Sequence, residues 1–171
     1  MATFETQIEG LTGLAIDGTS NPTQDELSQF LTDGAKEVIN RLSKLDAGKM
    51  VLFSTSVTDS DNSGVAVDSG IVVDVVRADG VSASNLRPAD MIPSNARYRI
   101  TDSSSILYRS KYSPAYYILN GKVFVVPAPS DAGVDKAVVS YVTYPTVAYG
   151  DSSIGTSYKS ASGVTALESD P

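Results

Sequence analysis

The sequence contains neither cysteine nor histidine. Without cysteine there is no disulfide framework, no thiolate nucleophile and no thiolate metal ligand. Histidine is the commonest general base near neutral pH and the commonest metal ligand, so its absence excludes histidine-dependent serine catalysis and zinc sites built from histidine and cysteine. Carboxylate or lysine chemistry stays open, but no glycine-rich phosphate loop is present. We predict a protein that is not an enzyme and that needs no cofactor.

Long apolar runs and an excess of basic residues are also missing. No stretch of about 20 apolar residues is available to span a bilayer. The opening segment MATFETQIEG carries two glutamates and no basic residue, unlike a signal peptide. A formal charge of −7 argues against a protein whose main task is to grip phosphate. We expect a protein made inside a cell, without a membrane partner.

The clearest element is an amphipathic helix predicted over about residues 23–46. Thr23 and Glu26 have the spacing of a capping box, and Gly48 stands where the helix is expected to end. Gly34 inside the helix costs about 1 kcal/mol relative to alanine, so its place indicates close packing against a neighbouring backbone. Apolar residues recur at intervals of three and four and form one face. They are Leu27, Phe30, Leu31, Ala35, Val38, Ile39, Leu42 and Leu45.

Beyond the helix, alternating β-branched residues predict a β region over about residues 49–145. Two apolar runs joined by Asn120 and Gly121 predict a tight hairpin. Pro88 to Met91 is expected to form a short helical turn, and the segments RYRI and YRSKY are expected to be strands. The predicted fold class is α+β, with one long N-terminal helix packed on an antiparallel sheet or sandwich.

The expected organisation is an N-terminal arm, one domain and a tail. Residues 1–20 are predicted to be an extended arm, because glycines are set between apolar residues. Residues 21–149 form the single α+β domain. Residues 150–171 are rich in serine and glycine with no periodicity, which predicts an extended tail.

The loop DSDNSG has half of a calcium-binding pattern. Asp59, Asp61 and Ser63 stand at alternate positions and Gly64 follows, as in the first half of a calcium loop. The closing glutamate is missing, because position 12 falls on Gly70, and no helices are expected to flank the loop. The sequence therefore favours a polar hairpin connection and no metal, with the two aspartates and the serine as the ligands in the calcium alternative.

Basic and aromatic residues alternate in the segments RYRI and YRSKY. If both are strands, the cations share one face and the tyrosines the other. The functional interpretation is a positive patch for an acidic partner or DNA phosphate. The interpretation that we favour is a solvated strand face with tyrosines packed inward. The cations are Arg97, Arg99, Arg109 and Lys111, and the tyrosines are Tyr98, Tyr108 and Tyr112.

Asp74 is the carboxylate whose neighbours are most apolar, because it interrupts the run IVVDVV. Facing inward, it would have a raised pKa and could act as an acid. Strict alternation along a strand favours the opposite, a side chain in solvent.

Three features together resemble the adaptor, or head-to-tail connector, proteins of tailed-phage virions. They are an opening arm leading into the helix PTQDELSQFLTDGAKEVINRL, the β region, and the run from SPAYYILNGKVFVVPAPS to AVVSYVTYPTVAYGD. In that family a hairpin strand ends in Pro-x-Pro, here Pro127 and Pro129, and a later strand ends in Tyr-Pro, here Tyr144 and Pro145. The similarity covers most of the first 150 residues. Adaptors usually carry further helices after this β-domain, so a different neck, tail or capsid-decorating role stays open.

The resemblance implies a virion protein assembled in the host cytoplasm. It implies a ring, expected to be dodecameric, between the portal protein and a downstream tail or nozzle protein. DNA would pass through this ring without sequence-specific binding, and the basic patch would meet an acidic neighbour. Contacts between subunits are expected from Leu11, Leu14 and Ile16 in the arm and from Ile154, Tyr158, Val164 and Leu167 in the tail. The alternative is a capsid-decoration or receptor-binding β-rich module, typically a trimer with exposed tyrosines.

Overall fold

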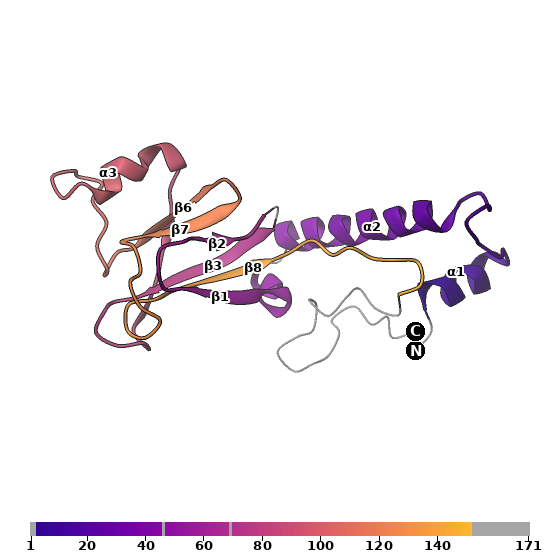
Figure 1. Ribbon diagram of the computed structural model, residues 1–171, viewed down its shortest axis with the longest axis horizontal. Coiled ribbons are helices and arrows are strands. Elements are labelled where there is room, and N and C mark those ends of the chain that lie inside the picture. Colours follow the sequence, from indigo (N-terminus) through magenta and orange to yellow (C-terminus); the bar gives the residue numbers. More distant parts are fainter. Residues whose placement is uncertain (1–2, 46, 69, 152–171) are drawn as a thin grey trace. The chain divides into compact units, whose positions relative to one another are not determined.

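The computed structural model describes residues 3–45, 47–68 and 70–151 (Figure 1). The chain divides into two compact units, and the single domain predicted over residues 21–149 stays a prediction. The helical unit comprises Met1–Phe53 and Tyr144–Pro171, and the β-unit comprises Ser54–Thr143. The fold class is α+β, as predicted, and the packing of the helix on the sheet stays a prediction. Among the described residues, none of the helices has the length and apolar character needed to cross a membrane.

The helical unit contains helix α2, Gln24–Leu45, which confirms the helix predicted over residues 23–46. The predicted capping box begins it. The Thr23 N–H donates to Glu26 Oε2 at 2.9 Å, and the Glu26 N–H donates to Thr23 Oγ1 at 3.3 Å. The Thr23 N–H and the Thr23 hydroxyl both donate to the Glu26 carboxylate and lower the pKa of that carboxyl. A 3₁₀ helix, η1, follows at Ala47–Phe53.

Helix α1, Phe4–Thr12, corrects the predicted extended arm. The Thr3 hydroxyl caps it by accepting a hydrogen bond from the Thr6 N–H at 3.2 Å. Gly13 ends it with a left-handed φ of 69°, and the Gly13 N–H donates to the Glu9 carbonyl at 2.7 Å. None of the nine residues of α1 is buried. Local capping and backbone hydrogen bonds from its first turn to residues 149–151, rather than a core, therefore define this helix.

Residues 144–151 run along α2 in the opposite direction. The Tyr144 hydroxyl donates to Asn40 Oδ1. About two turns nearer the start of α2, Thr32 makes two hydrogen bonds with Val147. The Thr32 hydroxyl donates to the Val147 carbonyl at 3.2 Å and accepts from the Val147 N–H at 3.0 Å. Because Thr32 and Val147 are both buried, this pair of hydrogen bonds joins the returning chain to the helix.

The variant Thr32→Val is expected to lower the unfolding free energy by about 1–3 kcal/mol, because it leaves the buried Val147 N–H and carbonyl without their partner. Circular dichroism during urea unfolding measures this. Thr12→Val, at an exposed position of α1, is the control and is expected to change the free energy by less than about 0.5 kcal/mol. Equal effects of the two variants would show that the buried hydrogen bonds contribute little.

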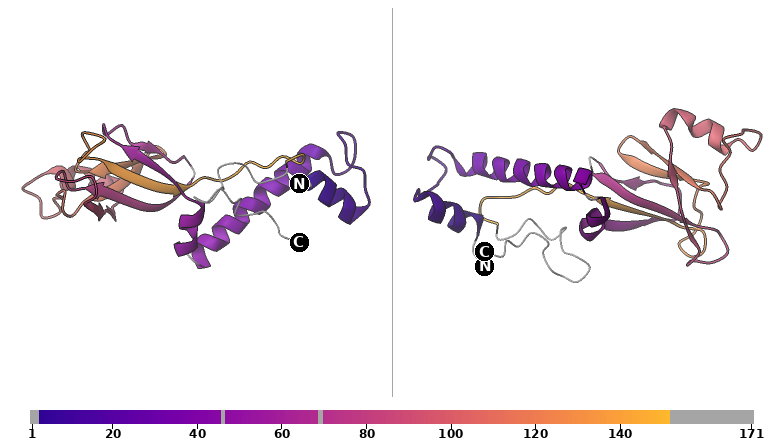
Figure 2. Two further views of the ribbon diagram at one scale, coloured as in Figure 1. Left: turned by 90° about the horizontal axis from the view of Figure 1, so that it is seen from below. Right: turned by 180° about the vertical axis from the view of Figure 1, so that it is seen from behind.

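The β-unit consists of two four-stranded sheets, seen from two further sides in Figure 2. Their strand orders are β1-β8-β3-β4 and β2-β7-β6-β5, and all pairs are antiparallel except β5 with β6. The strands are β1 Thr55–Asp59, β2 Val65–Ala66, β3 Ile71–Ala78, β4 Leu86–Pro88, β5 Asp90–Met91, β6 Ala115–Leu119, β7 Lys122–Val126 and β8 Ala137–Val142.

The core of the β-unit is formed almost entirely by valines. Val75 and Val139 come from the first sheet, and Val65, Val123 and Val125 come from the second. Inward positions alternate with outward ones along each strand, so a β-branched residue at every second position fills the space between the sheets. The packing is that of two sheets face to face.

Local turn chemistry is confirmed, whereas several short elements differ from the prediction. Asn120 and Gly121 have φ values of 51° and 72° and join β6 to β7, as expected for a two-residue hairpin. The segment predicted as a helical turn belongs to strands β4 and β5. The segment RYRI is a helix, α3, Arg97–Thr101, after a 3₁₀ turn, η2, at Ser94–Ala96. The segment YRSKY is not a strand, and its Ser110 forms an isolated bridge with Ser113, which follows the segment.

Candidate functional site

An apolar groove lies along α2 in the helical unit. Its volume is about 260 Å³. The chain covers only part of the apolar face of α2: Ala35 and Ile39 are buried, but the side chains of Phe30 and Val38 are 62% and 50% exposed. The groove is lined by Phe4, Phe30, Leu31, Gly34, Ala35, Val38 and Val147.

Gly34 lies in this groove with open space beside it. A Cβ atom at Gly34 would meet no atom of the described residues within 4 Å. The sequence predicted that this glycine permits close approach of another backbone, and the described part of the chain supplies no such neighbour. The position is therefore accessible to a partner.

The apolar residues of the predicted arm divide into two classes. Leu11 and Leu14 are exposed, so both are available to a partner. Ile16 is only 6% exposed, and its N–H donates to Glu9 Oε1 at 2.9 Å. Ile16 is therefore buried in the free chain, and the expected partner contact at this residue stays a prediction. The expected contacts at Ile154, Tyr158, Val164 and Leu167 lie outside the described residues.

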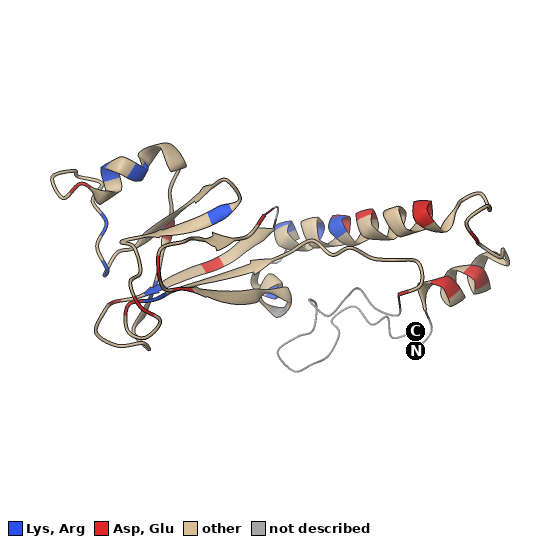
Figure 3. Cartoon of the chain, in the orientation of Figure 1, with Lys and Arg blue, Asp and Glu red and all other residues tan. Residues whose placement is uncertain are grey.

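The basic residues of the β-unit do not form the predicted strand face. Arg97 and Arg99 lie on α3. Arg109 Nη1 lies 2.9 Å from Asp90 Oδ2, and Lys111 Nζ lies 3.0 Å from an oxygen of Asp135. Two of the four cations are thus paired with carboxylates. Figure 3 shows basic and acidic residues interspersed over this unit.

The three tyrosines of this region are exposed, which corrects the prediction that they pack inward. Cations contact two of them. The Arg97 guanidinium lies 4.4 Å from the centre of the Tyr98 ring, and the Arg87 guanidinium lies 5.2 Å from that of Tyr112. The surface is therefore aromatic as well as basic, a composition suited to protein recognition.

A buried ion cluster surrounds Arg77, and no sequence pattern predicted it. This side chain is fully buried, and its Nε and Nη2 atoms donate to the carbonyls of Pro127 and Ala128 at 2.7 and 3.0 Å. Its Nη2 also lies 2.8 Å from Asp135 Oδ1, and Lys111 Nζ lies 3.0 Å from the same oxygen. The cluster fixes the loop between β7 and β8 onto β3.

Asp135 makes the β-unit sensitive to acid. Burial raises the pKa of its carboxyl, but the Ser130 hydroxyl and the charges of Lys111 and Arg77 outweigh burial and lower the pKa from 3.8 to about 2. The folded state thus binds this proton more weakly than the unfolded state. The stabilisation, roughly 2 kcal/mol, is complete above the unfolded pKa and lost as pH falls toward 2.

Urea unfolding at a series of pH values between about 5 and 2 tests this dependence, because unfolding free energy follows the difference in bound protons. The wild type is expected to lose stability more steeply than Asp135→Asn, whose side chain does not titrate. Parallel curves for the two proteins would assign the acid sensitivity to other carboxylates.

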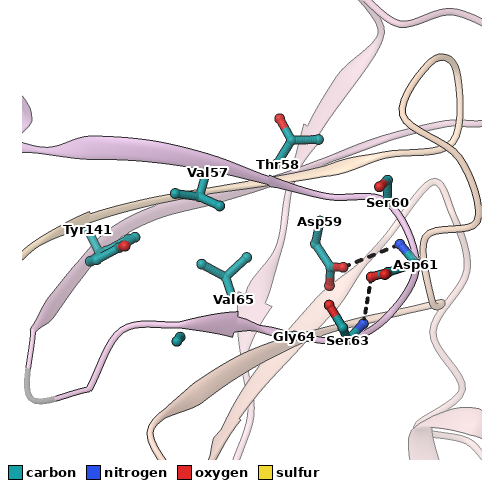
Figure 4. A pocket seen from close by; sticks show the side chains of 10 residues that line it. Val57, Thr58, Asp59, Ser60, Asp61, Ser63, Gly64, Val65 and Tyr141 are labelled. Atoms are coloured by element: carbon teal, nitrogen blue, oxygen red, sulfur yellow. Dashed lines mark hydrogen bonds between the residues drawn. The ribbon is translucent and has the colours of Figure 1, made fainter.

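The loop between β1 and β2 surrounds a polar pocket of about 420 Å³ (Figure 4). It joins the two sheets, so the predicted hairpin connection is corrected to a crossover. Asp59 is 3% exposed, and its Oδ2 atom is buried without a hydrogen-bond partner among the described residues. Asp61 Oδ1 accepts from the Ser63 N–H at 3.0 Å. Across the described ranges, no three acidic side chains converge on one point.

Asp74 is exposed on β3, as strict alternation predicted. No protein-family model matches the chain, and no curated protein matches it either.

Proposed function

We propose that this chain is a non-enzymatic structural protein of a tailed-phage virion, an adaptor that forms a ring beneath the portal protein. The family resemblance of the sequence supplies the position in the virion. The open apolar groove along α2 is the observation that supports assembly. Exposed aromatic and aliphatic side chains in contiguous patches are typical of surfaces that bind other proteins.

The groove favours a neighbouring subunit as its occupant. Burial of apolar surface stabilises an interface by about 25 cal/mol per Å², and Phe30 and Val38 offer that surface in the free chain. Gly34 between them gives a second backbone room to approach. In a closed ring each subunit uses two different surfaces. The exposed Leu11 and Leu14 are candidates for the complementary surface.

The charge of the helical unit suits a ring that DNA traverses. Acidic residues gather on α1 and on the first half of α2 (Figure 3). Where such residues line a channel they repel phosphate, so DNA slides without tight binding. This proposal involves no sequence-specific contact with DNA and no membrane.

Native mass spectrometry of the purified chain, alone and mixed with portal protein, tests the proposal. A ring of about twelve copies, formed alone or only on the portal, is the expected result. A monomer that ignores the portal, or a stable trimer, would contradict it.

The exposed tyrosines favour a second candidate function. Tyr98, Tyr108 and Tyr112 are all exposed near α3 of the β-unit. Exposed aromatic residues are enriched where proteins recognise partners, so a capsid-decoration or receptor-binding module is the alternative. This module would form a trimer or a monomer and would bind capsid or glycan. The same mass measurement therefore separates the two functions.

A further inference from the structure

We propose that the loop between β1 and β2 binds a calcium-like divalent cation through Asp59, Asp61 and Ser63. The inference does not depend on the virion role. It goes beyond the sequence pattern, which lacked the closing glutamate and by itself favoured a plain polar connection. The structure adds the placement and burial of the first carboxylate.

The main observation is the unpartnered oxygen of Asp59. The Asp59 side chain points from the end of β1 toward the loop between β1 and β2 (Figure 4). Its Oδ1 atom accepts a hydrogen bond from the Asp61 N–H at 3.5 Å. Its Oδ2 atom, by contrast, is buried with no donor among the described residues. A buried carboxylate oxygen without a partner is costly. A bound cation would remove that cost.

Burial from water does not exclude an ion at this oxygen. Calcium lies about 2.3–2.6 Å from its oxygen ligands, closer than a water molecule lies to a hydrogen-bonded oxygen. A space shaped for the ion among converging ligands can therefore be too small for water. The Oδ2 atom of Asp59 can therefore be a cation ligand even though it is inaccessible to water and has no hydrogen-bond donor among the described residues.

The other two ligands lie beside the first. Figure 4 shows the side chains of Asp59, Asp61 and Ser63 turned toward one another, and Asp61 Oδ1 accepts a hydrogen bond from the Ser63 N–H at 3.0 Å. Two carboxylates and a hydroxyl therefore converge. Hard cations such as calcium take oxygen ligands of these kinds, together with backbone carbonyls and waters.

Gly64 shapes the loop as the sixth residue of the pattern. Its φ is 75°, and a Cβ atom there would lie 2.8 Å from the ring of Phe124, so glycine is required by both conformation and space.

Lys122 Nζ donates to the Ser63 carbonyl at 3.3 Å, which places one competing positive charge at the edge of the loop. With two carboxylates and no closing glutamate, we expect a dissociation constant of about 0.1–1 mM, as in weak calcium modules.

Terbium luminescence of the full chain tests the site. Terbium replaces calcium and emits when a nearby aromatic ring is excited, and Tyr141 lines this pocket. Saturable emission that calcium displaces is expected. Asp61→Asn is expected to weaken binding at least about tenfold, because it removes one of two charged ligands. Asp61 is exposed, so this variant does not threaten the fold.

Asp102→Asn is the matched control. Asp102 accepts a hydrogen bond from the Ser104 N–H at 2.9 Å, as Asp61 does from Ser63, but it lies on an exposed turn after α3. This variant is expected to bind terbium and calcium as the wild type does. Calcium should also raise the melting temperature of the wild type and of Asp102→Asn, but not that of Asp61→Asn. Absence of saturable emission, or equal emission from Asp61→Asn and the wild type, would overturn the proposal.

Discussion

The variant Arg77→Met is expected to lose about 3–5 kcal/mol of unfolding free energy, because removal of one member of a buried ion pair leaves the other charge uncompensated. The side chain of Arg77 is wholly buried and holds the carbonyls of Pro127 and Ala128 as well as Asp135. Methionine has similar length and restores none of these interactions. Urea unfolding followed by circular dichroism measures the loss.

Lys111→Met is the control for Arg77→Met. Lys111 contacts the same oxygen of Asp135, but its side chain is 43% exposed. Its removal is expected to cost no more than about 1 kcal/mol, as for pairs in contact with solvent. The double variant Arg77→Met with Asp135→Leu should cost less than the sum of the two single changes, because it removes both buried charges. Additive costs would contradict a coupled pair.

The elements that could be predicted from the sequence are those whose signals are local. The start of α2 follows from Thr23 and Glu26, which bond each other's backbone across one helical turn. The β6–β7 hairpin follows from Asn120 and Gly121, two residues that tolerate positive φ. In each case the interacting groups lie within a few residues of one another, so the sequence contains the whole cause.

The elements that were missed depend on contacts between distant residues or on short segments. Strands β4 and β5 have three and two residues, so only their pairing with β3 and β6 defines them. Arg77 is buried because carbonyls 50 residues away accept its hydrogen bonds. Helix α1 did have a signal, Thr3 before it and Gly13 after it, but the glycines of the segment favoured an arm.

The loop between β1 and β2 and the groove along α2 each combine a feature that the sequence predicts with one that depends on distant contacts. The sequence predicted the spacing of Asp59 and Asp61, but the burial of one and the exposure of the other depend on the crossover between the two sheets. It also predicted an apolar face on α2. It could not predict which part of that face the returning chain covers, because residues 144–151 contact α2 across more than 100 residues of sequence.

The variant Val38→Glu is expected to abolish assembly while leaving the chain folded, a result that rests on the proposed function. Val38 is half exposed in the free chain, so the change should alter its stability by less than about 0.5 kcal/mol. In an assembly that fills the groove, the new carboxylate would be buried without a partner, at a cost of several kcal/mol. At about 1.4 kcal/mol per tenfold change, association should weaken at least about a hundredfold.

Gln29→Glu adds the same charge to an exposed position of α2 that does not line the groove, and it is expected to assemble normally.

Gly34→Ala is a milder second test. It should stabilise the free helix by up to about 1 kcal/mol, because a Cβ atom meets nothing within the described chain, and it should weaken assembly if a second backbone approaches there. Native mass spectrometry reports assembly and circular dichroism reports folding. If the wild type forms rings and both groove variants form them equally well, the interface between subunits lies elsewhere. If the wild type forms no ring, with or without portal protein, the result contradicts the adaptor role itself.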